Sequence, residues 1–122
     1  MSIQSWSDNM VLVELASEPE ASDELEGVIR CVRDRADCGV VVDFSNLTIL
    51  TSTSLAALLR LKKLLDSCEQ PLVLCSVGQA TRGIISVTGL DGVFEMVNDR
   101  FDALARAQAA PHGATTPSPR TV

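Results

Sequence analysis

Four consecutive hydroxyl residues, Thr-Ser-Thr-Ser at positions 51–54, carry the clearest chemical pattern in this 122-residue chain. They follow an apolar segment typical of a buried strand, residues 40–44, and directly precede a leucine-rich segment that begins at Leu55. Such a junction is a helix N-terminus, where unpaired N–H groups and the helix dipole favour an anion. A phosphate on one of these hydroxyls would add roughly −1.5 to −2 charges at a favourable place.

Two interpretations of these hydroxyls stay open on the residues alone. Serine and threonine are common helix caps, because their oxygens accept free backbone N–H groups. One cap needs one hydroxyl and this cluster has four, so a phosphate acceptor is the second interpretation. Asp43 is equally open: it either caps a turn near Asn46 or places an acid beside a phosphate site, at the carboxyl end of a strand where open α/β sheets carry function.

The other reactive residue types do not form a catalytic or metal-binding pattern. The single histidine, His112, lies in a proline-rich C-terminal segment, so no Ser-His-Asp set is expected in the body of the chain. The four cysteines form no Cys-x-x-Cys pair, and we expect free thiols of a reducing compartment. No glycine-rich phosphate loop occurs. We therefore predict a protein that is not an enzyme and has no cofactor and no metal.

Composition narrows the class of partner. The net charge of −6 argues against nucleic acid and against adhesion to an anionic membrane, both of which depend on Lys and Arg. No apolar run approaches the roughly 18 residues that a membrane span needs, so we predict no direct membrane insertion. The N-terminus lacks the basic and apolar pattern of a signal peptide, and we expect a cytoplasmic protein.

Periodicity predicts alternating strands and helices along residues 1–109. Strands are expected at residues 10–15, 40–44, 72–77 and 93–97, and helices after Ser22, from Leu55, over residues 79–87, and after a cap at Asn98 or Asp99. This order predicts an α/β fold: a single domain with a four- or five-strand mixed, largely parallel sheet and helices packed mainly on one side. Residues 110–122 are rich in proline and poor in bulky apolar residues, so we predict a disordered tail there.

The residues resemble a known family, the STAS domain of bacterial anti-sigma factor antagonists. The resemblance covers about residues 11–104 and rests on VVVDFSNLTIL, the hydroxyl cluster, the following helix and the downstream TGLDGVFEMV. The family's cluster typically reads Asp-Ser-Ser-Gly or Asp-Ser-Thr-Gly and then Leu. Here Thr51 replaces the acid and Ser54 replaces the glycine. Ser52 falls on the position that the family's kinases phosphorylate, with Thr53 as second choice.

The resemblance implies a regulatory binding module. Its partner would be an anti-sigma factor that is also a serine protein kinase, bound through residues Thr51, Ser52, Thr53, Ser54 and Asp43. Phosphorylation at Ser52 would weaken binding and so regulate sigma-factor-dependent transcription. The alternative is a STAS interaction subunit without phosphorylation, in a membrane transport system such as a lipid ABC transporter or in a stress-sensing scaffold. The sequence leaves the oligomeric state unknown.

Overall fold

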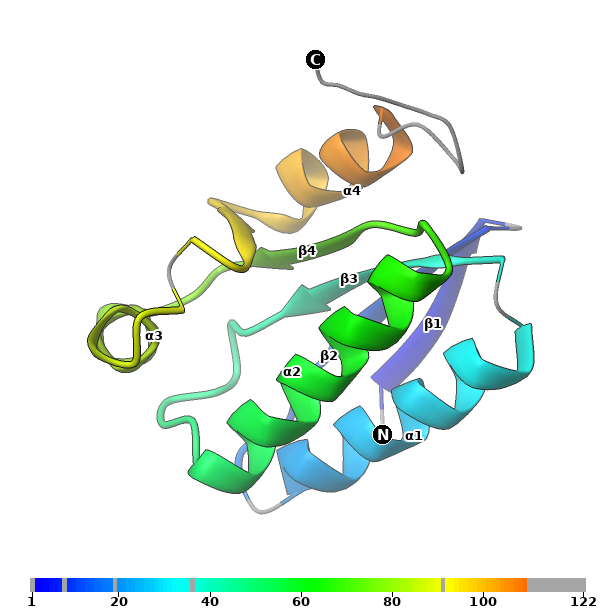
Figure 1. Cartoon of the computed structure of the whole chain (residues 1–122). Helices are drawn as coiled ribbons and strands as arrows, with labels where there is room; N and C mark the ends of the chain where they lie inside the picture. Colours follow the sequence, from blue (N-terminus) through cyan, green and yellow to red (C-terminus); the bar gives the residue numbers. More distant parts are fainter. Residues whose placement is uncertain (1, 8, 19, 36, 91, 110–122) are drawn as a thin grey trace.

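A five-stranded sheet with strand order β1-β2-β3-β4-β5 forms the centre of the molecule (Figure 1). The computed structural model describes residues 2–7, 9–18, 20–35, 37–90 and 92–109. The strands are β1 Ser2–Ser7, β2 Met10–Glu14, β3 Gly39–Asp43, β4 Leu72–Cys75 and β5 Glu95–Val97; the helices are α1 Glu20–Arg35, α2 Ser52–Ser67, α3 Gln79–Val87 and α4 Arg100–Ala109. Only β1 is antiparallel to its neighbour, and β2 to β5 run parallel. The predicted mixed, largely parallel α/β sheet is confirmed.

Each central strand contributes apolar side chains to both faces of the sheet. Val40 and Val42 of β3 pack in a large cluster with α1 and α2, whereas Val41 packs in a smaller cluster with α4. Successive side chains of a strand point to opposite faces, so a strand covered on both sides needs an uninterrupted apolar run. α1 and α2 lie side by side on one face, and α4 crosses the other (Figure 1).

Strand register aligns the carboxyl ends of the parallel strands. Glu14 pairs with Asp43, and Asp43 pairs with Cys75, so these residues form one row across the sheet. The connections that leave this row lead to α1, α2 and α3. At the opposite edge, the tight approach of Pro71 requires Gly39, because a Cβ there would lie 2.7 Å from Pro71 Cγ.

The observed elements differ from the sequence expectation at the N-terminal end. β1 was not predicted, because six mostly polar residues carry little strand pattern. α1 begins at Glu20 and not after Ser22, since the acidic Glu20 and Asp23 in the first turn favour an earlier start. The cap of α4 is Asp99, whose carboxylate accepts the N–H of Asp102 at 2.9 Å. The predicted helix over residues 79–87 is confirmed.

The predicted disordered tail, residues 110–122, lies outside the described residues. Within the described ranges, no helix combines the length and the apolar character that crossing a bilayer requires.

Candidate functional site

The four hydroxyl residues lie at the start of α2, as the sequence predicts. Thr51 is the cap: its backbone is extended (φ −83°, ψ 163°) and its Oγ1 accepts the N–H of Ser54 at 3.2 Å. The Thr51 carbonyl accepts the N–H of Leu55 at 2.9 Å and starts the helix. The cap interpretation is therefore confirmed for Thr51, and the other three hydroxyls are not needed for it.

The next three residues differ in their access to solvent. Ser52 and Thr53 are exposed in the first turn, whereas Ser54 is completely buried beneath them. No acidic residue lies in the first turn of α2. Ser52 and Thr53 thus present hydroxyls to solvent at a helix N-terminus that lacks its own anion. Ser54 does not reach the surface and has no direct access to a macromolecular partner.

Glu18, from the connection between β2 and α1, supplies a carboxylate to the start of α2. Its Oε2 accepts the backbone N–H of Thr51 at 3.1 Å and the Thr51 hydroxyl at 2.9 Å. Partial burial raises the pKa of Glu18, but the nearby Ser54 hydroxyl, the two hydrogen bonds from Thr51 and the Ser22 backbone outweigh it and hold the pKa below its ordinary value. The cap is therefore tied to a loop that precedes it by about thirty residues.

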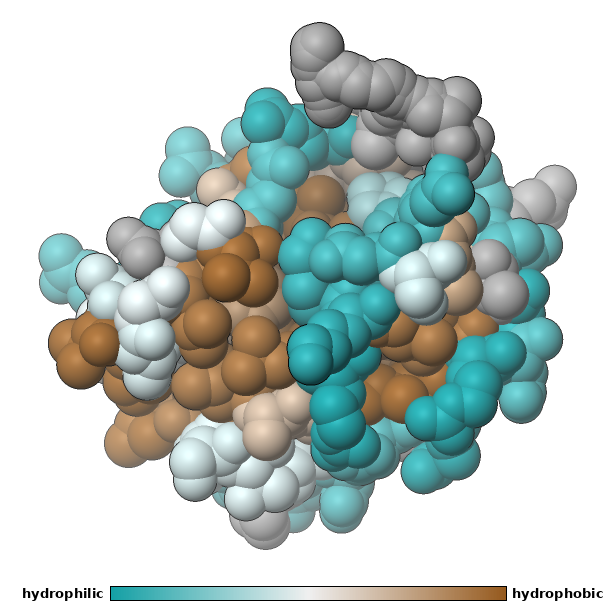
Figure 2. All heavy atoms as spheres, viewed as in Figure 1, coloured by the Kyte–Doolittle hydropathy of each residue, from teal (hydrophilic) through white to brown (hydrophobic). Residues whose placement is uncertain are grey.

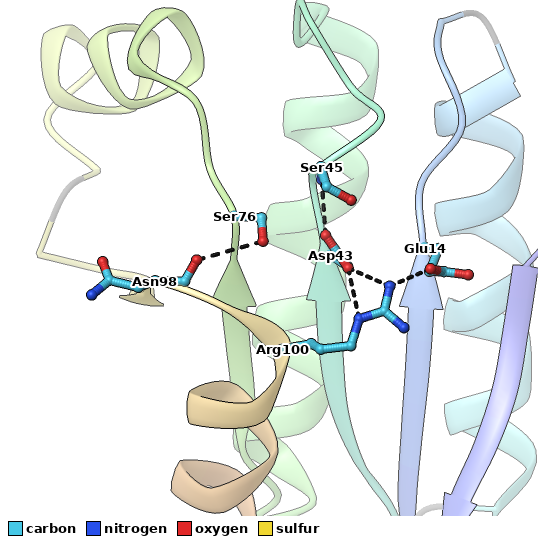
Figure 3. A network of polar contacts seen from close by, with 6 residues as sticks. All are labelled: Glu14, Asp43, Ser45, Ser76, Asn98 and Arg100. Atoms are coloured by element: carbon cyan, nitrogen blue, oxygen red, sulfur yellow. Dashed lines mark hydrogen bonds and ion pairs between the residues drawn. The ribbon is translucent and has the colours of Figure 1, made fainter.

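Asp43 lies in a second polar cluster at the carboxyl edge of the sheet (Figure 3). Its carboxylate is only 3 % exposed and accepts the N–H of Ser45 at 2.8 Å, which is the turn-capping interpretation. Arg100, the first residue of α4, donates to Asp43 Oδ2 from Nε at 3.1 Å and from Nη2 at 2.7 Å, and also pairs with Glu14. The geometry joins α4 to the ends of β2 and β3 and leaves Asp43 without a free surface.

The charges in this cluster affect its titration. Burial raises the pKa of Asp43, but the Ser45 hydrogen bonds and the Arg100 guanidinium outweigh burial. The pKa of Asp43 therefore lies below its ordinary value. Burial, with a smaller contribution from Asp43, raises the pKa of Cys75 to about 11. The Cys75 thiol is therefore protonated near neutral pH and is a poor nucleophile. Beside it, Ser76 donates its backbone N–H to the Asn98 carbonyl at 3.2 Å, fixing the segment that leads into α4.

Hydrophobic side chains reach the surface next to the hydroxyl cluster. Figure 2 shows them gathered between α3 and α2. Leu55 and Leu59 of α2 are half-buried, and Ile49, in the loop before Thr51, is 62 % exposed. Val87 at the end of α3 is also exposed. We call Ile49, Leu55 and Leu59, with the exposed Ser52 and Thr53, the α2-start surface.

Sequence reasoning found part of this site. The structure brings Thr51, Ser52, Thr53 and Ser54 together, but places Asp43 in the separate cluster with Arg100. Glu18 and Arg100 were missed. Glu18 could have been suspected as an acid that follows a strand at the edge where the hydroxyls were expected. Arg100 contacts a residue 57 positions away, and no local pattern indicates that pairing.

The fold and site agree with comparisons to known proteins. A family model described as "Mlab, STAS domain" matches residues 4–98, more than half of the chain. The chain therefore belongs to the STAS domain family. It is similar to BtrV of Bordetella bronchiseptica, which is named as a candidate anti-sigma factor antagonist, with 27% identity over 89 residues that cover 73% of this chain and 77% of BtrV.

Solved structures share the same fold. A variant of RsbS from Moorella thermoacetica matches with a TM-score of 0.76 and 18% identity over 88% of this chain and 93% of that one. The anti-sigma factor antagonist SpoIIAA in its unphosphorylated form matches with a TM-score of 0.71 and 13% identity, over 88% and 97% of the two chains. Phosphorylated SpoIIAA from Bacillus gives a TM-score of 0.67 and 14% identity, over 86% and 96%.

Proposed function

We propose that this chain is an anti-sigma factor antagonist, a binding module that is switched by phosphorylation of Ser52. In the unmodified state, the α2-start surface binds an anti-sigma factor that is also a serine protein kinase, and the sigma factor is released for transcription. Phosphorylation of Ser52 by that kinase ends the interaction. Such a cycle uses ATP and operates in the cytoplasm.

The observation that carries the proposal is the exposed Ser52 hydroxyl at the first position of α2, beside exposed apolar side chains. Apolar residues such as Ile49 favour a protein interface. The helix N-terminus tolerates a phosphate in the free protein. In the complex, the same dianion would have to lose its water next to apolar groups, which is costly. Two similar proteins support this assignment. BtrV is named as a candidate anti-sigma factor antagonist, and SpoIIAA has a structure in a phosphorylated form.

Thr53 is the second choice for the phosphate because it is also exposed in the first turn. Ser54 is excluded as an acceptor by its burial, since a kinase cannot reach its hydroxyl. Thr51 uses its hydroxyl as both acceptor from Ser54 and donor to Glu18. We therefore propose that Thr51 and Ser54 stabilise the α2-start surface, whereas Ser52 and Thr53 contact the partner.

The test begins with affinity capture from native lysate and identification of the bound proteins by mass. A captured kinase is then purified and incubated with this protein and ATP, and the phosphate is mapped by mass spectrometry. We expect phosphate on Ser52, and none on Ser52→Ala unless Thr53 substitutes. Binding without any phosphate on either residue would contradict the switch. Capture of a membrane transporter subunit or a stress-sensing assembly, with no kinase, would favour the unphosphorylated interaction subunit.

A further inference from the structure

The contact between Glu18 and the start of α2 bears on how a phosphate would act, given the function proposed above. We propose that Glu18 holds the anion position at the start of α2 in the unphosphorylated protein, and that phosphoserine at position 52 displaces it. The phosphate would then change the connection between β2 and α1 as well as the α2-start surface. Modification would be communicated between two loops that both border the carboxyl edge of the sheet.

The first step of the argument is the geometry of Glu18. One carboxylate oxygen accepts two hydrogen bonds from Thr51, from the backbone N–H at 3.1 Å and from the hydroxyl at 2.9 Å. The Thr51 N–H comes from the residue directly before Ser52. A carboxylate at this place makes the favourable interaction with the helix N-terminus that an incoming phosphate would also make.

The second step is the identity of the residues that face Glu18. Thr51 donates both of its hydrogen bonds to Glu18, and the hydroxyl of Thr51 in turn caps the N–H of Ser54. Ser54 Oγ is completely buried, and neither it nor the buried Glu18 Oε1 has a hydrogen-bond partner of good geometry among the described residues. Ser54 nonetheless lies near enough to contribute to the lowered pKa of Glu18. A carboxylate from another loop thus stands where the cluster itself lacks one.

The third step is competition between like charges. A phosphate on Ser52 would be attached one residue from the N–H that Glu18 occupies, and both anions would share one helix terminus. Like charges at short distance repel, and a dianion has the stronger attraction to the terminus. The flexible Glu18 side chain is therefore the group that leaves, and its two bonds to Thr51 are lost.

The test installs phosphoserine at position 52 by genetic-code expansion in the full chain, with no kinase or partner present. The melting temperature is measured with and without the phosphate, in the native background and in Glu18→Gln. Glutamine keeps an amide oxygen that can accept the Thr51 bonds but carries no charge. We expect the phosphate to lower the melting temperature more in the native chain than in Glu18→Gln, and the two decreases should differ by about 3 °C or more.

The matched control is Glu26→Gln, which removes the same charge from an α1 residue that pairs with Arg60 of α2. In this background the phosphate should lower the melting temperature as much as in the native chain. An equal effect in the native and Glu18→Gln chains would overturn the proposal. So would amide NMR spectra of the native chain in which phosphoserine leaves the signals of Ala16, Ser17 and Glu18 unchanged, a readout that does not depend on folding of the variant.

The experiment separates a failure of this inference from a failure of the proposed function. If phosphoserine displaces Glu18 but no kinase modifies Ser52, the internal competition stands and the kinase assignment fails. If a kinase modifies Ser52 but the two backgrounds respond equally, the kinase assignment stands and the competition is overturned.

Discussion

At the scale of single residues, the ion pair of Asp43 and Arg100 includes a carboxylate that is almost completely buried. Arg100 lies at the first position of α4, where the helix dipole disfavours a cation. Its two hydrogen bonds to the buried Asp43 and its pairing with Glu14 offset that cost. The pair therefore stabilises the attachment of α4 to the sheet and, through the Ser45 N–H, the turn that leads toward α2.

We predict that Arg100→Gln lowers the free energy of unfolding by about 2–3 kcal/mol at pH 7, because it leaves the buried Asp43 carboxylate poorly compensated. The folded-state pKa of Asp43 is lowered, so its stabilising contribution is present above its unfolded pKa and is lost as pH falls through the folded value. The difference between native and variant should thus narrow as pH drops below about 4. Urea denaturation at several pH values measures the free energy of unfolding of both proteins and hence this difference.

The control for this prediction is Lys62→Gln, which removes a cation from a surface pair with Asp66 on α2. It should change the free energy of unfolding by less than about 0.5 kcal/mol. A deficit of Arg100→Gln that stays constant down to pH 3 would show that Asp43 is not the group that depends on Arg100.

Local sequence predicted the residues whose role is local. Thr51 caps the helix that follows it, and Ser52 is exposed in its first turn, because both positions depend on neighbours only a few residues away. Glu18 and Arg100 act on residues 33 and 57 positions away. The positions of Glu18 and Arg100 depend on the order of the strands in the sheet, and no local sequence pattern predicts such contacts.

At the scale of elements, α4 is attached by a small apolar cluster. Ala103, Leu104 and Ala107 are its buried residues and pack on the face of the sheet that α1 and α2 leave open. Two alanines contribute little apolar area, so Leu104 is the principal apolar contact of this helix. The strand pattern at residues 40–44 already predicted burial on both faces. It did not show which helix covers the second face.

We predict that Leu104→Ala lowers the free energy of unfolding by about 2–3 kcal/mol through lost burial and a cavity. Phe101→Ala, on the same helix, should change it by less than about 0.5 kcal/mol, because Phe101 is 71 % exposed. Thermal or urea denaturation of both variants measures the contrast. Equal losses for the two variants would contradict the observed orientation of α4.

At the scale of the whole molecule, the folded unit is predicted to end with α4. Residues 110–122 have the composition of a segment that cannot offset its ordering entropy by burial. Truncation after Ala109 should leave the melting temperature unchanged within error. A drop of several degrees would show that these residues dock on the domain.

The central claim is that the charge state of Ser52 decides whether the α2-start surface binds its partner. The most direct measurement is the affinity of native protein, Ser52→Ala and Ser52→Asp for the kinase captured as described above, with melting temperatures in parallel. We expect Ser52→Asp to stay folded and bind about tenfold more weakly or worse, a loss of about 1.4 kcal/mol. Ser52→Ala should stay folded and bind like the native protein. Native-like affinity of a folded Ser52→Asp would contradict the account.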